Sequence, residues 1–212
     1  MQLHNYFRSS ASYRVRVALE LKGLGYEYVP VHLVRGEQTR APFADIAPTP
    51  LVPVLVDGGL TLSQSLAIIE YLDETHPEPL LLPGTAADRA RIRSLAMDVA
   101  CEIHPLNNLR VLRFLTQDLG VSEDAKMLWV RHWIEDGLAA VEHRLANDAA
   151  TGRFCHGDTP TLADLTLVPQ IFNARRFECE LDTMPTLLRI YDNCLALDAF
   201  QRAQPSACSD AA

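Results

Sequence analysis

A helical pattern lies between the first two strand-like segments of this chain, and this order strongly limits the fold. Leu3–Phe7 is apolar enough for a strand, and Ser10–Lys22 carries apolar residues at helical spacing before Gly23. β-Forming residues are then concentrated in Tyr26–Leu33. A sheet built only from tightly connected antiparallel strands would not place a helix between the first two strands. The pattern therefore predicts a β-α-β unit at the start of the fold.

A hairpin and a second helix complete the first predicted domain. In Val52–Leu62, an Asp-Gly-Gly turn separates two β-forming runs, which is typical of a hairpin. Ser63–Thr75 has the apolar spacing of an amphipathic helix, for which Ser63 is the expected N-cap. A β-α-β unit followed by a hairpin and a helix is the layout of the thioredoxin-like fold. Residues 1–80 are therefore expected to form a thioredoxin-like α/β domain, followed by a proline-rich linker to Gly84.

The rest of the chain favours an all-helical domain over residues 86–205. The expected helices are Ala87–Gln117 interrupted at Pro105, Glu123–Ala149, a helix from the Thr161–Asp164 capping box to about Arg175, one opened by Met184-Pro185, and a short one ending at Phe200. The segment after Pro205 is expected to be disordered. The predicted class is thus α/β plus all-α.

Composition limits the partners and the compartment. The chain has 19 basic and 27 acidic residues, a net charge of −8, which argues against nucleic-acid and anionic-membrane surfaces. The N-terminus resembles no signal peptide, and no segment reaches transmembrane length. The five cysteines form no C-x-x-C pair, and the histidines lack metal-ligand spacing. We therefore expect a soluble cytoplasmic protein with no disulfide framework and no metal.

The junction between the first strand and the first helix is a candidate anion site. The first backbone N–H groups of a helix lack partners within the helix, and the helix dipole favours negative charge there. Ser9 and Ser10 add hydroxyl groups at this point, and Arg8 adds a positive charge. Such a turn suits a thiolate or a carboxylate. The alternative is that Ser9 or Ser10 only caps the helix, which is the commoner role of such serines.

Several motifs together resemble those of the glutathione transferase superfamily, and most closely its zeta class, which includes maleylacetoacetate and maleylpyruvate isomerases. The resemblance extends to about residue 205. It is carried by Phe7–Ser12 with Arg14–Arg16, Val52-Pro53, Gln64–Leu72, Leu81–Pro83, Thr161–Leu165 and Val168–Gln170. One position departs from the zeta pattern, because Ala11 stands where a cysteine usually follows the two serines. The resemblance implies the glutathione transferase fold, with glutathione as the cofactor.

The resemblance also implies which residues bind glutathione. A cis bond between Val52 and Pro53 would let the Val52 backbone pair with the cysteinyl part of glutathione, whereas the plain alternative is a trans proline at a strand start. Gln64 and Ser65, at the start of a helix, would hold the γ-glutamyl carboxylate. His104 and Asn108 are further candidates for glutathione contact, because four-residue spacing puts them on one helical face.

The implied catalytic residues are Ser9, with Ser10 as the second choice, Arg8 and His104. A free thiol has a pKa of about 8.5, so little of it is ionised at neutral pH. A hydrogen bond to a charged group contributes about 1.5–3 kcal/mol, or one to two pKa units. Ser9 and the helix N-terminus would therefore make the glutathione thiolate the major species. The sulfur belongs to glutathione, so Ala11 is compatible with this chemistry.

The expected substrate is a small dianionic maleyl compound held in a cleft between the two domains. Arg8, Arg110 and Arg176 are the candidates for its carboxylates, although each arginine alone is as well explained by a solvated surface or an ion pair. On an ideal helix, Arg110 would lie about 120° around from His104. Arg175 is the competing choice for Arg176.

The resulting hypothesis is a glutathione-dependent cis–trans isomerase that converts maleylpyruvate to fumarylpyruvate in aromatic-compound degradation. The alternatives are maleylacetoacetate isomerase of tyrosine and phenylalanine catabolism, a general glutathione transferase acting on xenobiotic electrophiles, and a non-catalytic protein of the same fold. The family also implies a homodimer, formed through Ser63–Thr75 and the long helix from Ala87. In such a dimer, Asp98 would reach the partner's glutathione.

Overall fold

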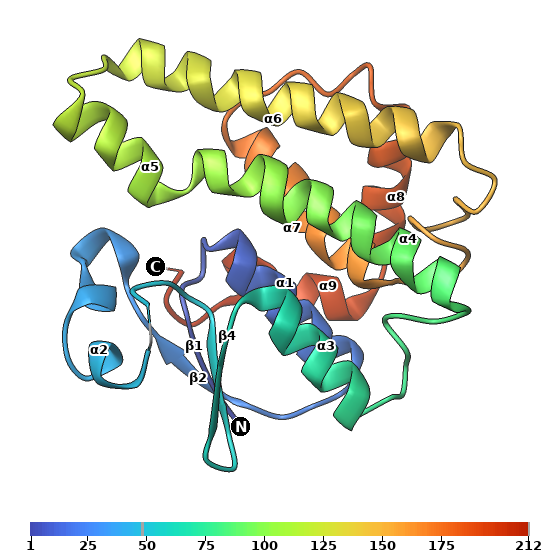
Figure 1. The fold of residues 1–212 in the computed structure, drawn as a ribbon, viewed down its shortest axis with the longest axis horizontal. Helices are drawn as coiled ribbons and strands as arrows, with labels where there is room; N and C mark the ends of the chain where they lie inside the picture. The colour runs from blue at the N-terminus through green and yellow to red at the C-terminus, as the bar shows by residue number, and fades with distance from the viewer. Residues whose placement is uncertain (48, 212) are drawn as a thin grey trace. The chain divides into compact units, whose positions relative to one another are not determined.

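The computed structural model describes residues 1–47 and 49–211, and the chain divides into two compact units (Figure 1). The first unit comprises Met1–Leu82 and Leu195–Ala212, and the second comprises Pro83–Cys194. The expectation that all of residues 86–205 belongs to the helical domain is wrong for its last part. That part returns to the first unit, where Ala203 accepts a hydrogen bond from the first helix at 2.9 Å.

The first unit contains a four-stranded sheet with strand order β2-β1-β3-β4. Strand β1 (Gln2–Asn5) pairs in parallel with β2 (Glu27–Pro30) and antiparallel with β3 (Val54–Asp57). Strand β4 (Leu60–Ser63) closes the predicted hairpin, whose two turn glycines have φ values of 53° and 93°. Helix α1 (Ser10–Leu21) connects β1 to β2, which confirms the predicted β-α-β unit.

Three helices of the first unit pack together: α1, α3 (Ser65–Thr75) and α9 (Asp198–Ala203) (Figure 1). Helix α1 is the central one, since it contacts both others. Its apolar residues Val15, Val17 and Leu19 are fully buried. Burying each such side chain contributes about 1.5–3 kcal/mol. The short helix α2 (Phe43–Ile46) buries Phe43 in the same unit.

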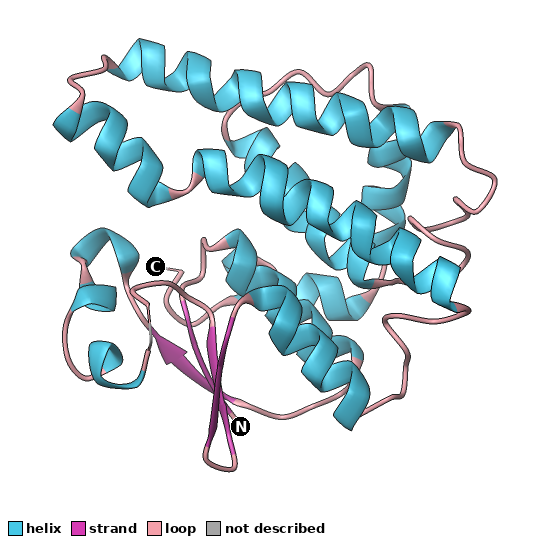
Figure 2. Ribbon diagram, viewed as in Figure 1, coloured by secondary structure: helices cyan, strands magenta, loops and turns pink. Residues whose placement is uncertain are grey.

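The second unit is helical in all its regular structure within the described residues (Figure 2). Its helices are α4 (Ala86–Met97), α5 (Leu109–Arg113), α6 (Glu123–Ala146), α7 (Leu162–Arg176) and α8 (Pro185–Leu195). The predicted capping box is confirmed, because the carboxylate of Asp164 accepts from both the N–H and the hydroxyl of Thr161 at 2.8 and 2.9 Å. Helix α7 contacts both α4 and α6, and its first ten residues, 162–171, are all buried.

The predicted long helix 87–117 is interrupted more than proline alone would require. A π-helical turn, Asp98–Ile103, follows α4, and a 3-10 turn, His104–Asn107, follows it with Pro105 near its start. Asn108 then has extended backbone angles, φ −65° and ψ 143°, and begins α5. The missing N–H of Pro105 accounts for part of this interruption, and the extended backbone of Asn108 separates the 3-10 turn from α5.

Two further expectations are wrong. Ser63 is the last residue of β4, and Gln64 is the N-cap residue of α3, because the hairpin pairing extends to Ser63. The segment after Pro205 is not disordered over its described residues. It begins with a 3-10 turn, and the side chain of Asp210 accepts a hydrogen bond from Tyr28.

A buried ion pair holds the segment that follows α3 in the first unit. The ammonium group of Lys22 lies 2.8 Å from the carboxylate of Asp73, and both side chains are almost fully enclosed. Every remaining bond of this pair goes to the segment after α3: Lys22 donates to the carbonyls of His76 and Pro79, and Asp73 accepts from the N–H groups of Leu81 and Leu82.

We predict that Asp73→Ala lowers the free energy of unfolding by about 3–5 kcal/mol, because it leaves a buried ammonium and two N–H groups without a carboxylate. Urea denaturation measures the loss. Lys22→Ala is the matched variant, and the double variant should cost less than the sum of the two single ones. Losses below about 1 kcal/mol for both single variants would show that the pair behaves as a surface ion pair.

Candidate active site

Ser9 stands at the N-terminus of α1, where its capping role is compatible with contact to a ligand. It is the N-cap residue, and its Oγ accepts a hydrogen bond from the Ser12 N–H at 3.2 Å. Its own N–H donates to the Tyr6 carbonyl at 3.0 Å, which closes a tight turn. Accepting a bond uses a lone pair of the hydroxyl and leaves its proton to donate. The cap therefore orients the Ser9 hydroxyl without consuming its donor.

Burial separates the two serines. Ser9 is half-buried, whereas Ser10, the first residue of α1, is only 8% exposed. A hydroxyl that meets a ligand has to be reachable from solvent. The structure therefore favours Ser9 over Ser10 as the group that contacts a bound anion.

Arg16 is a buried cation that holds the turn before Ser9, and sequence reasoning assigned it no role. Its side chain is 1% exposed. It donates hydrogen bonds to neutral oxygens: Nη2 donates to the Phe7 carbonyl at 3.0 Å, Nη1 to Asn5 Oδ1 at 2.9 Å and to the Tyr6 carbonyl at 3.5 Å, and Nε to the Ala203 carbonyl at 2.9 Å. The sequence signal for this role is an arginine placed between two apolar residues, Val15 and Val17, of the predicted helix.

A second buried arginine links α1 to the start of α3. Arg14 is 2% exposed, and its Nη1 donates to the hydroxyl of Ser65 at 3.2 Å. Ser65 is the first residue of α3, so the positive charge of Arg14 adds to the favourable dipole at that helix terminus. Gln64 just before it is exposed and has φ 70° and ψ 114°, a conformation that residues other than glycine rarely adopt. These features suit the binding of a carboxylate at the start of α3.

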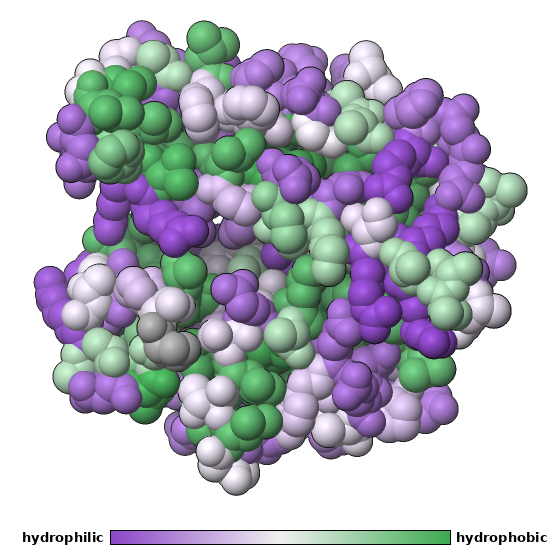
Figure 3. All heavy atoms as spheres, viewed as in Figure 1, coloured by the Kyte–Doolittle hydropathy of each residue, from purple (hydrophilic) through white to green (hydrophobic). Residues whose placement is uncertain are grey.

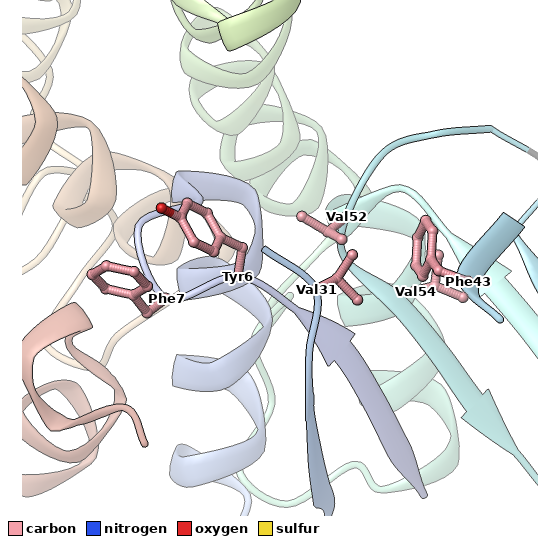
Figure 4. Packing of buried hydrophobic residues seen from close by; sticks show 6 residues of the cluster. All are labelled: Tyr6, Phe7, Val31, Phe43, Val52 and Val54. Atoms are coloured by element: carbon pink, nitrogen blue, oxygen red, sulfur yellow. The ribbon is translucent and has the colours of Figure 1, made fainter. Parts of the chain in front are cut away.

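The Val52–Pro53 bond is cis, as the resemblance implied. Val52 is buried in a hydrophobic cluster with Tyr6, Phe7, Val31, Phe43 and Val54, which Figure 4 shows from close by. Tyr6 and Phe7 meet edge to face with ring centroids 4.8 Å apart. The cis bond and the turn that leads to Ser9 are therefore packed into the same cluster.

The residues predicted on the second unit are arranged differently from expectation. His104 is half-buried in the 3-10 turn, while Asn108 is the extended residue that caps α5 and accepts from the Arg110 N–H at 3.1 Å. His104 and Asn108 therefore do not share a helical face. The 120° relation between His104 and Arg110 also fails, because the chain breaks between them. Arg110 itself is exposed.

Exposed arginines are stacked on aromatic rings. The guanidinium of Arg8 lies 4.9 Å from the centroid of Phe7, and that of Arg176, the last residue of α7, lies 4.6 Å from Phe177. The competing Arg175 is stacked on Tyr191 at 4.4 Å. Stacking orders the guanidinium plane and leaves its edges suited to a carboxylate.

Asp98 pairs with Arg144 of its own unit, and Arg144 also donates to Ser94 at 3.2 Å. The Asp98 carboxylate, which the family resemblance predicts to reach the glutathione of a partner subunit, is thus paired within its own unit.

Burial makes four of the protein's five thiols poor nucleophiles. All five cysteines are free, and burial raises the pKa of four of them, to about 11 for Cys179; the others are Cys155, Cys194 and Cys208. A thiol with a raised pKa stays protonated at neutral pH, and the thiolate is the reactive form. An anion site at Ser9 is therefore better suited to a thiolate brought by a ligand than to one of these four.

Within the described residues, no three His, Cys, Asp or Glu side chains are grouped to hold a metal ion. In the same part of the chain, every helix is too short or too polar to span a bilayer.

Comparison with known proteins places the chain in a family. The N-terminal domain of glutathione S-transferase matches residues 1–74. A probable maleylacetoacetate isomerase of Vibrio cholerae is 50% identical over 212 residues, covering 97% of this chain and 98% of the relative. The solved holo structure of a maleylpyruvate isomerase, described as a bacterial zeta-class glutathione S-transferase, has 47% identity and a TM-score of 0.97 over 100% of both chains.

A second solved structure carries ligands. It is a maleylacetoacetate isomerase of Methylobacterium extorquens AM1 with bound malonate and glutathione, 42% identical, with a TM-score of 0.97 over 100% of both chains. Identity of this level over the full length, together with the thioredoxin-like sheet and the helical unit, shows that the chain belongs to the glutathione S-transferase family, among the zeta-class enzymes.

Proposed function

We propose that the chain is a glutathione-dependent cis–trans isomerase that converts maleylpyruvate to fumarylpyruvate, with maleylacetoacetate as the alternative substrate. The observation that carries this proposal is the half-buried Ser9 hydroxyl, oriented by its capping bond at the N-terminus of α1. Relatives named as isomerases of both maleyl compounds support the reaction class.

Glutathione is the co-substrate, and its extended peptide fits the features of the first unit. The backbone of Val52 would pair with the cysteinyl part, beside the cis bond to Pro53. Gln64 and Ser65 would hold the γ-glutamyl carboxylate at the N-terminus of α3, where Arg14 adds positive charge behind Ser65. The thiol would then be received by Ser9. His104 and Asn108 are proposed as additional glutathione contacts from the second unit.

Thiolate addition removes the barrier to rotation about the double bond. The glutathione thiolate attacks the olefinic carbon β to the ketone, which forms a C–S bond and converts the ketone to an enolate. The carbon–carbon bond, now single, rotates. The enolate then collapses, the C–S bond breaks, and the trans product leaves with glutathione regenerated. No proton, electron or metal ion is consumed.

Arginines would supply the complementary charge. We assign the carboxylates of the dianion to Arg8, Arg110 and Arg176, each of which is exposed. Charge-assisted bonds to carboxylates both position the substrate and offset the charge that develops on the enolate. His104, half-buried, would assist near the enolate oxygen. A general transferase for xenobiotic electrophiles would require an apolar site and not several arginines, and a non-catalytic protein would not need the Ser9 turn.

A homodimer in the cytoplasm is the expected state of such an enzyme. The family dimerises through the region of α3 and α4, and the five free cysteines agree with a reducing compartment. Sedimentation of a monomer at micromolar concentration would contradict the dimer.

The function is tested by incubating the protein with each maleyl compound, with and without glutathione, and following the trans product. We expect isomerisation of both compounds only when glutathione is present, because one methylene discriminates by only about 1–3 kcal/mol. Maleylpyruvate should have the higher kcat/KM, since its terminal carboxylate lies one methylene closer to the reacting ketone and benefits from Arg110 and His104. An advantage for maleylacetoacetate would reverse the substrate assignment, and activity without glutathione would contradict the mechanism.

Ser9→Ala should lower kcat/KM at neutral pH by about 10- to 100-fold, the value of one hydrogen bond to a charged group. Losing this bond raises the thiol pKa, so the deficit should shrink as the pH rises and the thiol ionises without help. The pH profile of kcat/KM measures this shift. Ser9→Thr, which keeps the cap and the hydroxyl, should restore most of the activity. A larger loss in Ser10→Ala than in Ser9→Ala would transfer the role to Ser10.

Arg8→Ala and Arg176→Ala should raise KM for the dianionic substrate by about tenfold or more, while hardly changing KM for a neutral conjugation substrate. Arg175→Ala is the matched control, since Arg175 is also exposed and ring-stacked but is not assigned to the substrate. Steady-state kinetics with both substrate types makes the comparison. Equal effects on both types would indicate that these arginines act only on structure.

A further inference from the structure

We propose that Asp210 is a positioning residue for the Ser9 turn: its carboxylate fastens the Phe7 peptide and thereby sets where the Ser9 hydroxyl stands. This inference deepens the proposed function and, for its effect on catalysis, rests on it. It concerns the segment Gln204–Ala211, which sequence reasoning left without a role.

Both polar groups of the Phe7 backbone are held by groups connected to this segment. The Phe7 N–H donates to Asp210 Oδ2 at 3.4 Å. The Phe7 carbonyl accepts from Arg16 Nη2 at 3.0 Å, and the same guanidinium donates through Nε to the Ala203 carbonyl at 2.9 Å. Ala203 immediately precedes Gln204. These three hydrogen bonds and the chain from Ala203 to Asp210 form a closed circuit, which runs from the Phe7 carbonyl through Arg16 and the segment back to the Phe7 N–H.

The segment itself is ordered along the way. The Ala207 N–H donates to the Gln204 carbonyl at 3.0 Å, and the Cys208 N–H donates to the Pro205 carbonyl at 3.2 Å. Cys208 and Ala211 pack against the hydrophobic cluster that contains Tyr6 and Phe7. Backbone hydrogen bonds and apolar packing on both sides of Asp210 therefore fix the position of its carboxylate.

The second oxygen of Asp210 is anchored to the sheet. The hydroxyl of Tyr28, on β2, donates to Asp210 Oδ1. Burial and this hydrogen bond raise the pKa of Tyr28, so it stays a donor at neutral pH. One carboxylate therefore connects a sheet strand to the peptide just before Arg8 and Ser9.

The position of this peptide matters for the proposed chemistry. Phe7 carries the ring on which Arg8 stacks, and its peptide leads directly into the capping turn of Ser9. A shift of about 1 Å in a group that contacts the reacting atoms can cost on the order of 100-fold in rate. The proposed glutathione contacts at Gln64 and Ser65 lie outside this circuit, and Val52 shares the hydrophobic cluster with Phe7 but none of the hydrogen bonds of the circuit. Loss of Asp210 should therefore affect the thiolate step more than glutathione binding.

The test uses the full chain with Asp210→Ala, and with Asp210→Asn as the conservative variant that retains one acceptor oxygen. We expect faster hydrogen exchange at the amides of residues 7–9 in Asp210→Ala, with unchanged exchange in α7, which monitors global folding. The kcat should fall about tenfold, with KM for glutathione within about twofold of wild type, and Asp210→Asn should lie between. Ser209→Ala, an exposed neighbour, is the control and should match wild type.

Unchanged exchange at residues 7–9 in Asp210→Ala would overturn the proposal, whatever the activity. Faster exchange with an unaltered kcat would also overturn it, because the turn would then be loosened without effect on the reaction. If the wild-type protein isomerises neither maleyl compound, the proposed function fails. The exchange experiment then still decides whether Asp210 holds the turn, and only the catalytic consequence is lost.

Discussion

The hydrogen bonds of the buried Arg16 guanidinium are the interactions that hold the turn before Ser9, and the geometry of the candidate site depends on them. Burying a cation is costly unless its donors find acceptors. Arg16 uses four oxygen acceptors, three of which are carbonyls of Tyr6, Phe7 and Ala203. The flat, many-donor guanidinium suits this arrangement, which the single ammonium of a lysine would not reproduce. The hydrogen bonds offset the cost of burying the charge. They also connect the end of β1, the turn before α1 and the end of α9 to one side chain.

This arrangement explains why the first turn of α1 suits an anion. With the carbonyls of residues 6 and 7 occupied by Arg16 and the Ser9 Oγ accepting from Ser12, the donors at the start of the helix are held in fixed directions. Ser9 keeps a proton to donate. Glutathione, the co-substrate, brings a thiol of its own, whereas burial raises the pKa of four of the protein's five thiols. Catalysis by the chain is then a matter of positioning and charge.

Local sequence patterns were sufficient for the parts of the molecule that depend on neighbouring residues. The β-α-β unit, the glycine hairpin turn and the Thr161–Asp164 capping box all follow from residues within a few positions of one another. The start of α3 was misplaced because strand pairing, a tertiary feature, extended β4 to Ser63. The break at Asn108 was missed because the π-helical and 3-10 turns around Pro105 have no distinct apolar period.

Long-range polar contacts were beyond the reach of such patterns. The bond from Arg16 to Ala203 spans 187 residues, and that from Phe7 to Asp210 spans 203. Nothing near Asp210 in the sequence indicates that its carboxylate reaches the first strand, so the segment was expected to be disordered. The Ser9, Val52 and Ser65 assignments came instead from motifs whose local geometry the structure describes: a capping serine, a cis proline bond and a helix start backed by Arg14.

The most direct test is the pKa of the glutathione thiol when bound to the wild-type chain, followed by thiolate absorbance during a pH titration. A helix N-terminus and an oriented hydroxyl should lower this pKa by about one to two units from the value of about 8.5 for a free thiol. Bound glutathione would then be largely thiolate at neutral pH. A bound thiol that titrates at the same pH as free glutathione would contradict the proposal that the Ser9 turn stabilises a thiolate.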